Sequence, residues 1–77
     1  MDRLISLLEQ TVPGIDFKND KQLVSGGKLD SIGIVSIIVM LQDEYDIELE
    51  LDEMSASNFE SVEDIHMILS KNTKRKK

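Results

Sequence analysis

The residues best placed to do chemistry lie where a glycine-containing loop meets an apolar run. Gly26-Gly27-Lys28-Leu29-Asp30-Ser31-Ile32-Gly33 puts the Ser31 hydroxyl at the predicted start of a helix. A helix start offers free backbone N–H groups and the positive end of the helix dipole. A phosphate ester on this hydroxyl would therefore lie in a favourable field. Position alone does not require such an ester, because a serine at a helix start is usually an N-cap.

Other reactive side chains do not form a catalytic or metal-binding set. The chain has no Cys, which excludes disulfides, thiolate metal sites and a protein thiol nucleophile. The one histidine, His66, falls on a predicted helix and is expected at its surface, and nothing suggests a catalytic pair with Ser31. The acidic stretch 43–53 has no glycine for the sixth position of a calcium loop. We therefore predict no metal site and no enzyme.

Two helices are expected to flank the loop that carries this motif. Apolar residues recur at helical spacing over residues 2–11 and stop at Pro13-Gly14. Residues 31–45 are apolar on almost every face and predict the most buried helix, with Asp30 or Ser31 as its N-cap. The long loop over residues 13–30 has no sustained period, and five apolar residues are available to pin it to the core: Ile15, Phe17, Leu23, Val24 and Leu29.

The second half predicts a connector, a short helical turn and a last helix. Residues 46–53 alternate like a half-buried strand, but they have no partner strand, so we expect an extended connector. Ser61 and Asp64 resemble a capping box that begins a helix ending near Asn72. A short turn over residues 54–59 is expected to face inward with Met54, Ala56 and Phe59, and Met40 and Met67 are expected to fill core or interface. The prediction is an all-α domain with three main helices and one short helix.

The charge distribution limits the possible partners. The net charge of the 77 residues is −6. Five of the nine basic residues lie in residues 71–77, so residues 1–70 hold four positive and fifteen negative charges. Such an acidic body repels nucleic acids and anionic membranes and attracts partners with a basic patch. The densest apolar run, residues 32–41, is too short to span a bilayer, so we expect no membrane insertion and a cytoplasmic protein.

Leu29-Asp30-Ser31-Ile32 resembles the Asp-Ser-Leu motif of acyl and peptidyl carrier proteins. The similarity continues in the acidic end of the second helix, residues 42–47, and at the start of the last helix, residues 59–65. It covers residues 4–69. Gly26 and Leu29 precede the motif at the spacing found in carriers, and Val35, Ile38 and Leu41 match the family's apolar helix positions after it.

The resemblance implies a small right-handed-type four-helix carrier bundle over residues 1–70. The basic residues 71–77 that follow are expected to form a disordered tail. Ser31 would hold 4′-phosphopantetheine through a phosphodiester, and this group would bring the thiol that the chain lacks. Asp30 would assist recognition by the phosphopantetheinyl transferase, which uses coenzyme A and Mg²⁺. Ile32 and Ile34 would either contact partner enzymes or pack in the core. The family resemblance also implies a monomer that meets acyl- or aminoacyl-loading and condensing enzymes with basic docking patches.

Departures from the family pattern bear on the cargo. Fatty-acid carriers usually have acidic residues where this chain has Gly33 and Ser36, and a proline where it has Glu50. These differences favour a dedicated pathway in which acyl or aminoacyl intermediates are held as thioesters. A D-alanyl carrier for cell-wall teichoic acid modification is an alternative, although the tryptophan typical of that group is missing. The other alternative is an acidic helical adaptor without a prosthetic group.

Overall fold

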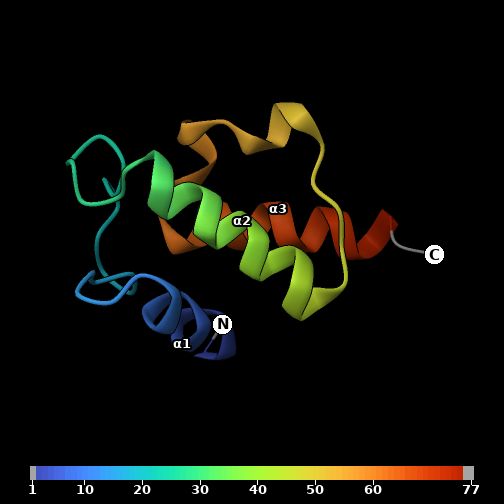
Figure 1. Cartoon of the computed structure of the whole chain (residues 1–77), viewed down its shortest axis with the longest axis horizontal. Coiled ribbons are helices and arrows are strands. Elements are labelled where there is room, and N and C mark those ends of the chain that lie inside the picture. The colour runs from blue at the N-terminus through green and yellow to red at the C-terminus, as the bar shows by residue number, and fades with distance from the viewer. Residues whose placement is uncertain (1, 76–77) are drawn as a thin grey trace.

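The computed structural model describes residues 2–75, and the side chains of residues 2–72. Within this range all regular structure is helical, which confirms the predicted fold class. The three α-helices are α1 (Asp2–Thr11), α2 (Ser31–Tyr45) and α3 (Val62–Arg75), and two 3₁₀ helices, η1 (Leu51–Met54) and η2 (Ala56–Phe59), lie between α2 and α3. In Figure 1 the long loop joins α1 to α2 at one end of the molecule, and the segment from α2 to α3 leaves from the other end.

One aliphatic core joins the helices to the loop. α1 packs against α2, and η2 contacts both α2 and α3. The loop is held by Phe17, Leu23 and Leu29, which are at most 2% exposed, while Ile15 and Val24 are partly buried. Burial of such side chains is the main stabilising term in a chain this small. The other buried apolar residues are Leu4, Leu8, Ile34, Ile37, Ile38, Leu41, Ile47, Leu49, Phe59, Val62, Ile65, Ile68 and Leu69.

Helix α2 is less buried than its composition predicted. Three of its apolar side chains are exposed: Ile32 (78%), Val35 (57%) and Val39 (57%). The opposite face of α2 is buried in the core, so its composition predicted the core face but not the exposed apolar one. The domain has too few elements to cover a whole helix, and α2 keeps one face toward solvent. The helix ends at Tyr45, and the left-handed backbone of the next residue, Asp46 (φ 52°, ψ 51°), lets the Ile47 N–H join the Asp46 N–H in donating to the Gln42 carbonyl.

The connector is extended only over its first part. Residues 46–50 have no regular structure, and η1 begins at Leu51. The Leu49 N–H donates to the Gln42 side chain (3.1 Å), and the Glu50 N–H donates to the Glu53 carboxylate (2.9 Å). These bonds replace strand pairing and turn the chain into η1. Leu51 is consequently 86% exposed, although its alternation with Ile47 and Leu49 predicted burial.

The end of the chain differs from the prediction in small ways. The expected single turn over residues 54–59 is two 3₁₀ helices, with Phe59 buried, Met54 partly buried and Ala56 exposed rather than inward-facing. Met40 packs partly buried against the core, whereas Met67 is 67% exposed. Helix α3 runs three residues past Asn72. Residues 76–77 of the predicted tail lie outside the described residues, and the division at residue 70 stays a prediction.

Candidate functional site

The start of α2 is capped by Asp30, which leaves Ser31 as the first helical residue. Asp30 has an extended backbone (φ −95°, ψ −178°), and its carboxylate oxygen Oδ1 accepts the Gly33 N–H at 2.8 Å. Its backbone carbonyl accepts the first intrahelical bond, from the Ile34 N–H (2.9 Å). The sequence allowed either Asp30 or Ser31 as the cap, and the structure selects Asp30. The serine side chain is thus released from capping.

Ser31 is exposed, and no described residue forms a hydrogen bond with its hydroxyl. Most other serine hydroxyls are already engaged. Ser36, one turn further along α2, donates to the Ile32 carbonyl (3.0 Å), and Ser61 accepts the Asp64 N–H (3.2 Å) at the start of α3. Hydrogen bonds also engage the hydroxyls of Ser6, Ser25, Ser55 and Ser57. Ser31 therefore offers an accessible hydroxyl that is free to react.

Gly33 lets the loop and the helix approach each other closely. A Cβ atom at this buried position would lie 2.8 Å from Leu29 Cδ1 and 3.4 Å from Asp30 Oδ1. The site is thus built on a close contact between Leu29, just before the cap, and the first turn of α2. A larger residue at position 33 would displace the Leu29 side chain or the capping carboxylate.

The loop before the cap is itself tightly hydrogen bonded. The Leu23 carbonyl accepts the N–H groups of both Lys28 (3.0 Å) and Leu29 (2.8 Å). A single residue, Glu60, which follows η2, accepts hydrogen bonds from three backbone amides at the start of this turn. The Leu23 N–H donates to the Glu60 carbonyl (2.9 Å), and the N–H groups of Val24 and Ser25 both donate to Glu60 Oε1 (3.0 Å each).

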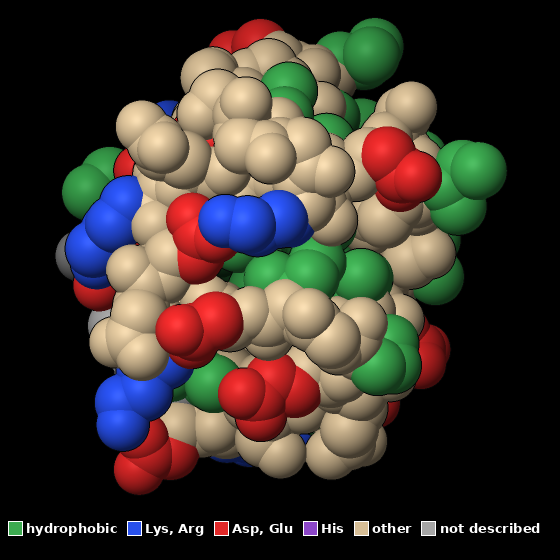
Figure 2. Space-filling model, turned by 90° about the vertical axis from the view of Figure 1, so that its left-hand side faces the viewer, with side chains coloured by type: hydrophobic (Ala, Val, Ile, Leu, Met, Phe, Trp, Pro, Cys, Tyr) green, Lys and Arg blue, Asp and Glu red, His purple; other side chains and the backbone are tan. Residues whose placement is uncertain are grey.

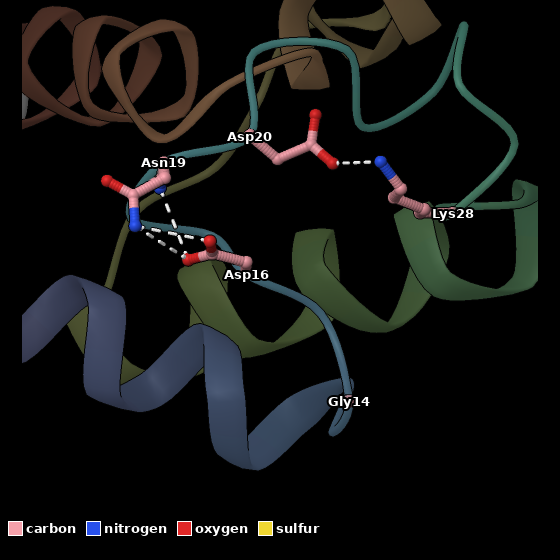
Figure 3. A pocket seen from close by; sticks show the side chains of 5 residues that line it. All are labelled: Gly14, Asp16, Asn19, Asp20 and Lys28. Atoms are coloured by element: carbon pink, nitrogen blue, oxygen red, sulfur yellow. Dashed lines mark hydrogen bonds and ion pairs between the residues drawn. The ribbon is translucent and has the colours of Figure 1, made fainter.

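A polar pocket of about 450 Å³ lies in the outer part of the same loop (Figure 3). Figure 3 shows the Lys28 and Asp20 side chains directed toward each other across the loop, where they form an ion pair. The Lys28 ammonium and, to a smaller extent, the Gln22 N–H hold the pKa of Asp20 below its ordinary value. The other lining residues are Gly14, Asp16 and Asn19, so none of the residues that line the pocket has an apolar side chain.

An apolar strip extends along α2 from the free hydroxyl. Ile32, Val35 and Val39 are all exposed and follow one another at spacings of three and four residues, which places them on one face of the helix. Ile34 is 9% exposed and belongs to the core. Of the two roles considered for these isoleucines, packing in the core applies to Ile34, whereas Ile32 is open to solvent. Figure 2 views the end of the molecule that carries the loop, and hydrophobic side chains are exposed there, among other places along the right-hand edge of the view.

Sequence reasoning identified Asp30 and Ser31 but missed Glu60. The structure brings Glu60 to the loop across 35 residues of chain. The nearby capping motif at Ser61 indicates a helix start, but it carries no information about which distant amides a neighbouring carboxylate will bind. His66 is exposed on α3, as expected. The described residues contain no group of three or more His, Cys, Asp or Glu arranged to hold a metal ion.

Comparisons with known proteins agree with this geometry. A family model described as a phosphopantetheine attachment site matches residues 2–65. No curated protein and no solved structure gave a significant match. No helix within residues 2–75 is long and apolar enough to cross a membrane. The match covers α1, the loop, α2 and the first turn of α3, and so includes every element that builds the start of α2.

Proposed function

Because the chain belongs to the phosphopantetheine attachment site family, we propose that Ser31 is the residue that carries 4′-phosphopantetheine, as a phosphodiester. Members of this family are carriers rather than catalysts, and they hold the group covalently on a serine. The observation that carries the assignment is the exposed, unengaged hydroxyl of Ser31 at the first position of α2.

The first turn of α2 fits a phosphodiester. The N–H groups at the start of a helix have no partner within the helix. Asp30 takes the Gly33 N–H, so the N–H groups of Ser31 and Ile32 remain for phosphate oxygens. The prosthetic group supplies the thiol on which thioesters form, which suits a chain without Cys. The protein's own part is to hold the attachment point rigidly at a helix start while leaving it open to solvent.

Asp30 supports recognition by the modifying transferase and its Mg²⁺. One carboxylate oxygen caps the helix, and no described residue forms a hydrogen bond with the other oxygen. That second oxygen is available to an approaching enzyme or its metal ion.

The partners are a phosphopantetheinyl transferase and the enzymes that load and unload the arm. An enzyme that reaches a group on Ser31 must approach the start of α2, where Ile32 and Val35 are exposed. Apolar contacts with these side chains would complement attraction between the acidic body and basic docking patches. The cargo is an acyl or aminoacyl thioester of a dedicated cytoplasmic pathway. D-alanyl loading remains the alternative cargo.

Intact mass spectrometry tests the attachment site. The purified chain is incubated with coenzyme A, Mg²⁺ and a broad-specificity phosphopantetheinyl transferase. We expect a gain of one phosphopantetheinyl group in the wild-type chain and in Ser36→Ala, and no gain in Ser31→Ala. Ser36→Ala is the matched control because it removes a hydroxyl from the same helix. A folded wild-type chain that stays unmodified would favour the adaptor alternative, and modification of Ser31→Ala would move the site elsewhere.

The modified chain then distinguishes the cargo classes. It is incubated with ATP and either a D-alanine-activating ligase or acyl-activating enzymes, and its intact mass is measured again. A D-alanyl gain alone would support the teichoic acid alternative over the proposed dedicated biosynthetic pathway.

A further inference from the structure

One glutamate outside the attachment motif binds the loop that leads to it. Glu60 lies between η2 and α3, and its side chain is half-buried. Its carbonyl and carboxylate accept the N–H groups of three successive residues, Leu23, Val24 and Ser25, and Oε1 also accepts the Ser25 hydroxyl (3.3 Å). We call these four bonds the Glu60 clasp. Bonds to a charged acceptor are stronger than those to a neutral one.

The clasp is connected to the attachment site through the chain itself. Leu23, which donates to the Glu60 carbonyl, accepts with its own carbonyl the N–H groups of Lys28 and Leu29. Leu29 precedes Asp30 directly and packs so closely on the first turn of α2 that a Cβ atom at position 33 would have to displace its side chain. Each step from Glu60 to the cap is a short hydrogen bond or a van der Waals contact.

We propose that Glu60 is a positioning residue for the modification of Ser31: the clasp holds loop residues 23–29 in the one arrangement that presents Asp30 and Ser31 to the transferase. This inference rests on the proposed function of Ser31. Without the Glu60 side chain, the bond from the Leu23 N–H to the Glu60 carbonyl would remain, but the amides of Val24 and Ser25 would bond to water in other loop conformations. The transferase would then find the competent arrangement in only a fraction of the molecules.

A positioning role has a kinetic signature. When only a fraction of a substrate is in the competent conformation, its apparent affinity falls by that fraction. The KM for the carrier should therefore rise, while kcat at saturating carrier stays nearly constant. Loss of a hydrogen bond to a charged group typically corresponds to a factor of about 10 or more in an equilibrium. We expect Glu60→Ala to raise KM by about tenfold.

Two further substitutions at position 60 separate the effect of side-chain length from that of charge. Glu60→Gln keeps an acceptor oxygen at the same distance and should restore KM to within about threefold of wild type. Glu60→Asp keeps the charge but shortens the side chain by one methylene, so it should behave like Glu60→Ala. Glu9→Ala is the control, because Glu9 is an exposed carboxylate on α1 and its removal changes the net charge by the same amount. It should leave KM unchanged.

Hydrogen exchange provides a readout that does not depend on the transferase. In the unmodified chain, Glu60→Ala and Glu60→Asp should accelerate exchange of the Val24 and Ser25 amides, while the amides in the middle of α2 keep their protection. Ile65→Val in the core of α3 controls for general destabilisation, since it should lower the melting temperature without raising KM. If Glu60→Ala fails to fold, Glu60→Asp and Glu60→Gln decide the result.

The outcomes distinguish this inference from the proposed function. An elevated KM together with faster loop exchange supports positioning. An elevated KM with unchanged exchange would mean that Glu60 touches the transferase directly, and an unchanged KM would mean that the clasp only stabilises the fold. Either result overturns the inference and leaves Ser31 as the attachment site. If the wild-type chain were never modified on Ser31, the proposed function would fail, whatever the exchange data showed.

Discussion

The two segments that join the three α-helices are each bound by one glutamate, but the two glutamates are buried to very different degrees. Glu60 holds the loop between α1 and α2 from outside the segment and is half-buried. Glu53 belongs to the connector between α2 and α3 and is only 6% exposed. Its carboxylate accepts the Glu50 N–H (2.9 Å) and, with both oxygens, the side-chain amide of Asn72 on α3 (3.2 Å each). Lys71 lies 3.9 Å from the same carboxylate.

The contrast separates two kinds of hydrogen-bonded glutamate. The buried bonds of Glu53 to Glu50 and Asn72, which we call the Glu53 lock, stabilise the fold, whereas the Glu60 clasp can open. A charge as buried as that of Glu53 is tolerated only when its oxygens are satisfied. Removing it takes away the carboxylate that the Asn72 amide binds, although that amide keeps its bond to the Ile68 carbonyl (2.9 Å). The clasp of Glu60 bonds backbone amides that lie close to water, which can replace the carboxylate when the loop opens. We therefore expect the connector to determine whether the domain folds, and the loop to determine how well Ser31 is presented.

The largest expected effect comes from breaking the lock. Glu53→Ala should lower the free energy of unfolding by about 2–4 kcal/mol, because it removes the buried hydrogen bonds to the Glu50 N–H and the Asn72 amide and creates a cavity. Glu53→Gln should lose less, since it keeps the volume and one acceptor. Urea denaturation followed by circular dichroism measures both. Domains of this size have little stability to spare, so Glu53→Ala is expected to be partly unfolded at 37 °C.

The control for this prediction is Glu48→Ala, which removes an exposed carboxylate from the same connector. It should change the stability by less than about 0.5 kcal/mol. If Glu53→Ala were equally mild, the connector would not be locked by its buried carboxylate, and the proposed difference between the two segments would disappear.

An effect of intermediate size is expected at the helix cap, where loop and site meet. Asp30→Ala removes the acceptor of the Gly33 N–H and should lower the free energy of unfolding by about 1 kcal/mol, measured by urea denaturation. Asp30→Asn keeps an acceptor that caps nearly as well, so its stability should stay close to wild type.

The same pair separates capping from recognition by the transferase. Asp30→Asn lacks the charge that we assign to transferase and Mg²⁺ recognition, so it should slow the modification of Ser31 while leaving the fold intact. The measurement is kcat/KM for phosphopantetheinyl transfer onto each variant. If Asp30→Asn were modified as fast as wild type, Asp30 would only cap the helix. The presentation of Ser31 to the transferase would then depend on the Glu60 clasp and not on the charge of Asp30.

Local patterns predicted the helices well because their signals are local. The spacing over residues 2–11 predicted α1 to the residue, and Ser61 with Asp64 marked the start of α3. The connector was harder, because its alternation is typical of a strand. The outcome was decided by the bonds from Gln42 to Leu49 and from Glu53 to Glu50.

Surface and long-range features of the site were beyond such patterns. The composition of α2 predicted the most buried helix of the domain, whereas the exposure of Ile32 and Val35 depends on how few elements are present to cover it. The Asp30-Ser31 motif was readable because it lies within one turn. The Glu60 clasp joins residues about 35 positions apart, and nothing in residue type or period indicates that pairing.

The smallest expected effect concerns the ion pair at the outer edge of the loop. Lys28 lowers the pKa of Asp20, so the folded carboxyl binds its proton less readily than the unfolded one. The pair therefore stabilises the fold above the unfolded pKa, and this contribution is lost as the pH falls through the lowered folded value. Lys28→Met should give a small loss of melting temperature at pH 7 that shrinks toward zero as the pH falls through the lowered pKa of Asp20, and high salt should weaken it. Thermal scans of wild type and Lys28→Met across this pH range measure the difference. A loss that persisted unchanged in acid would come from packing of the Lys28 side chain and not from its charge.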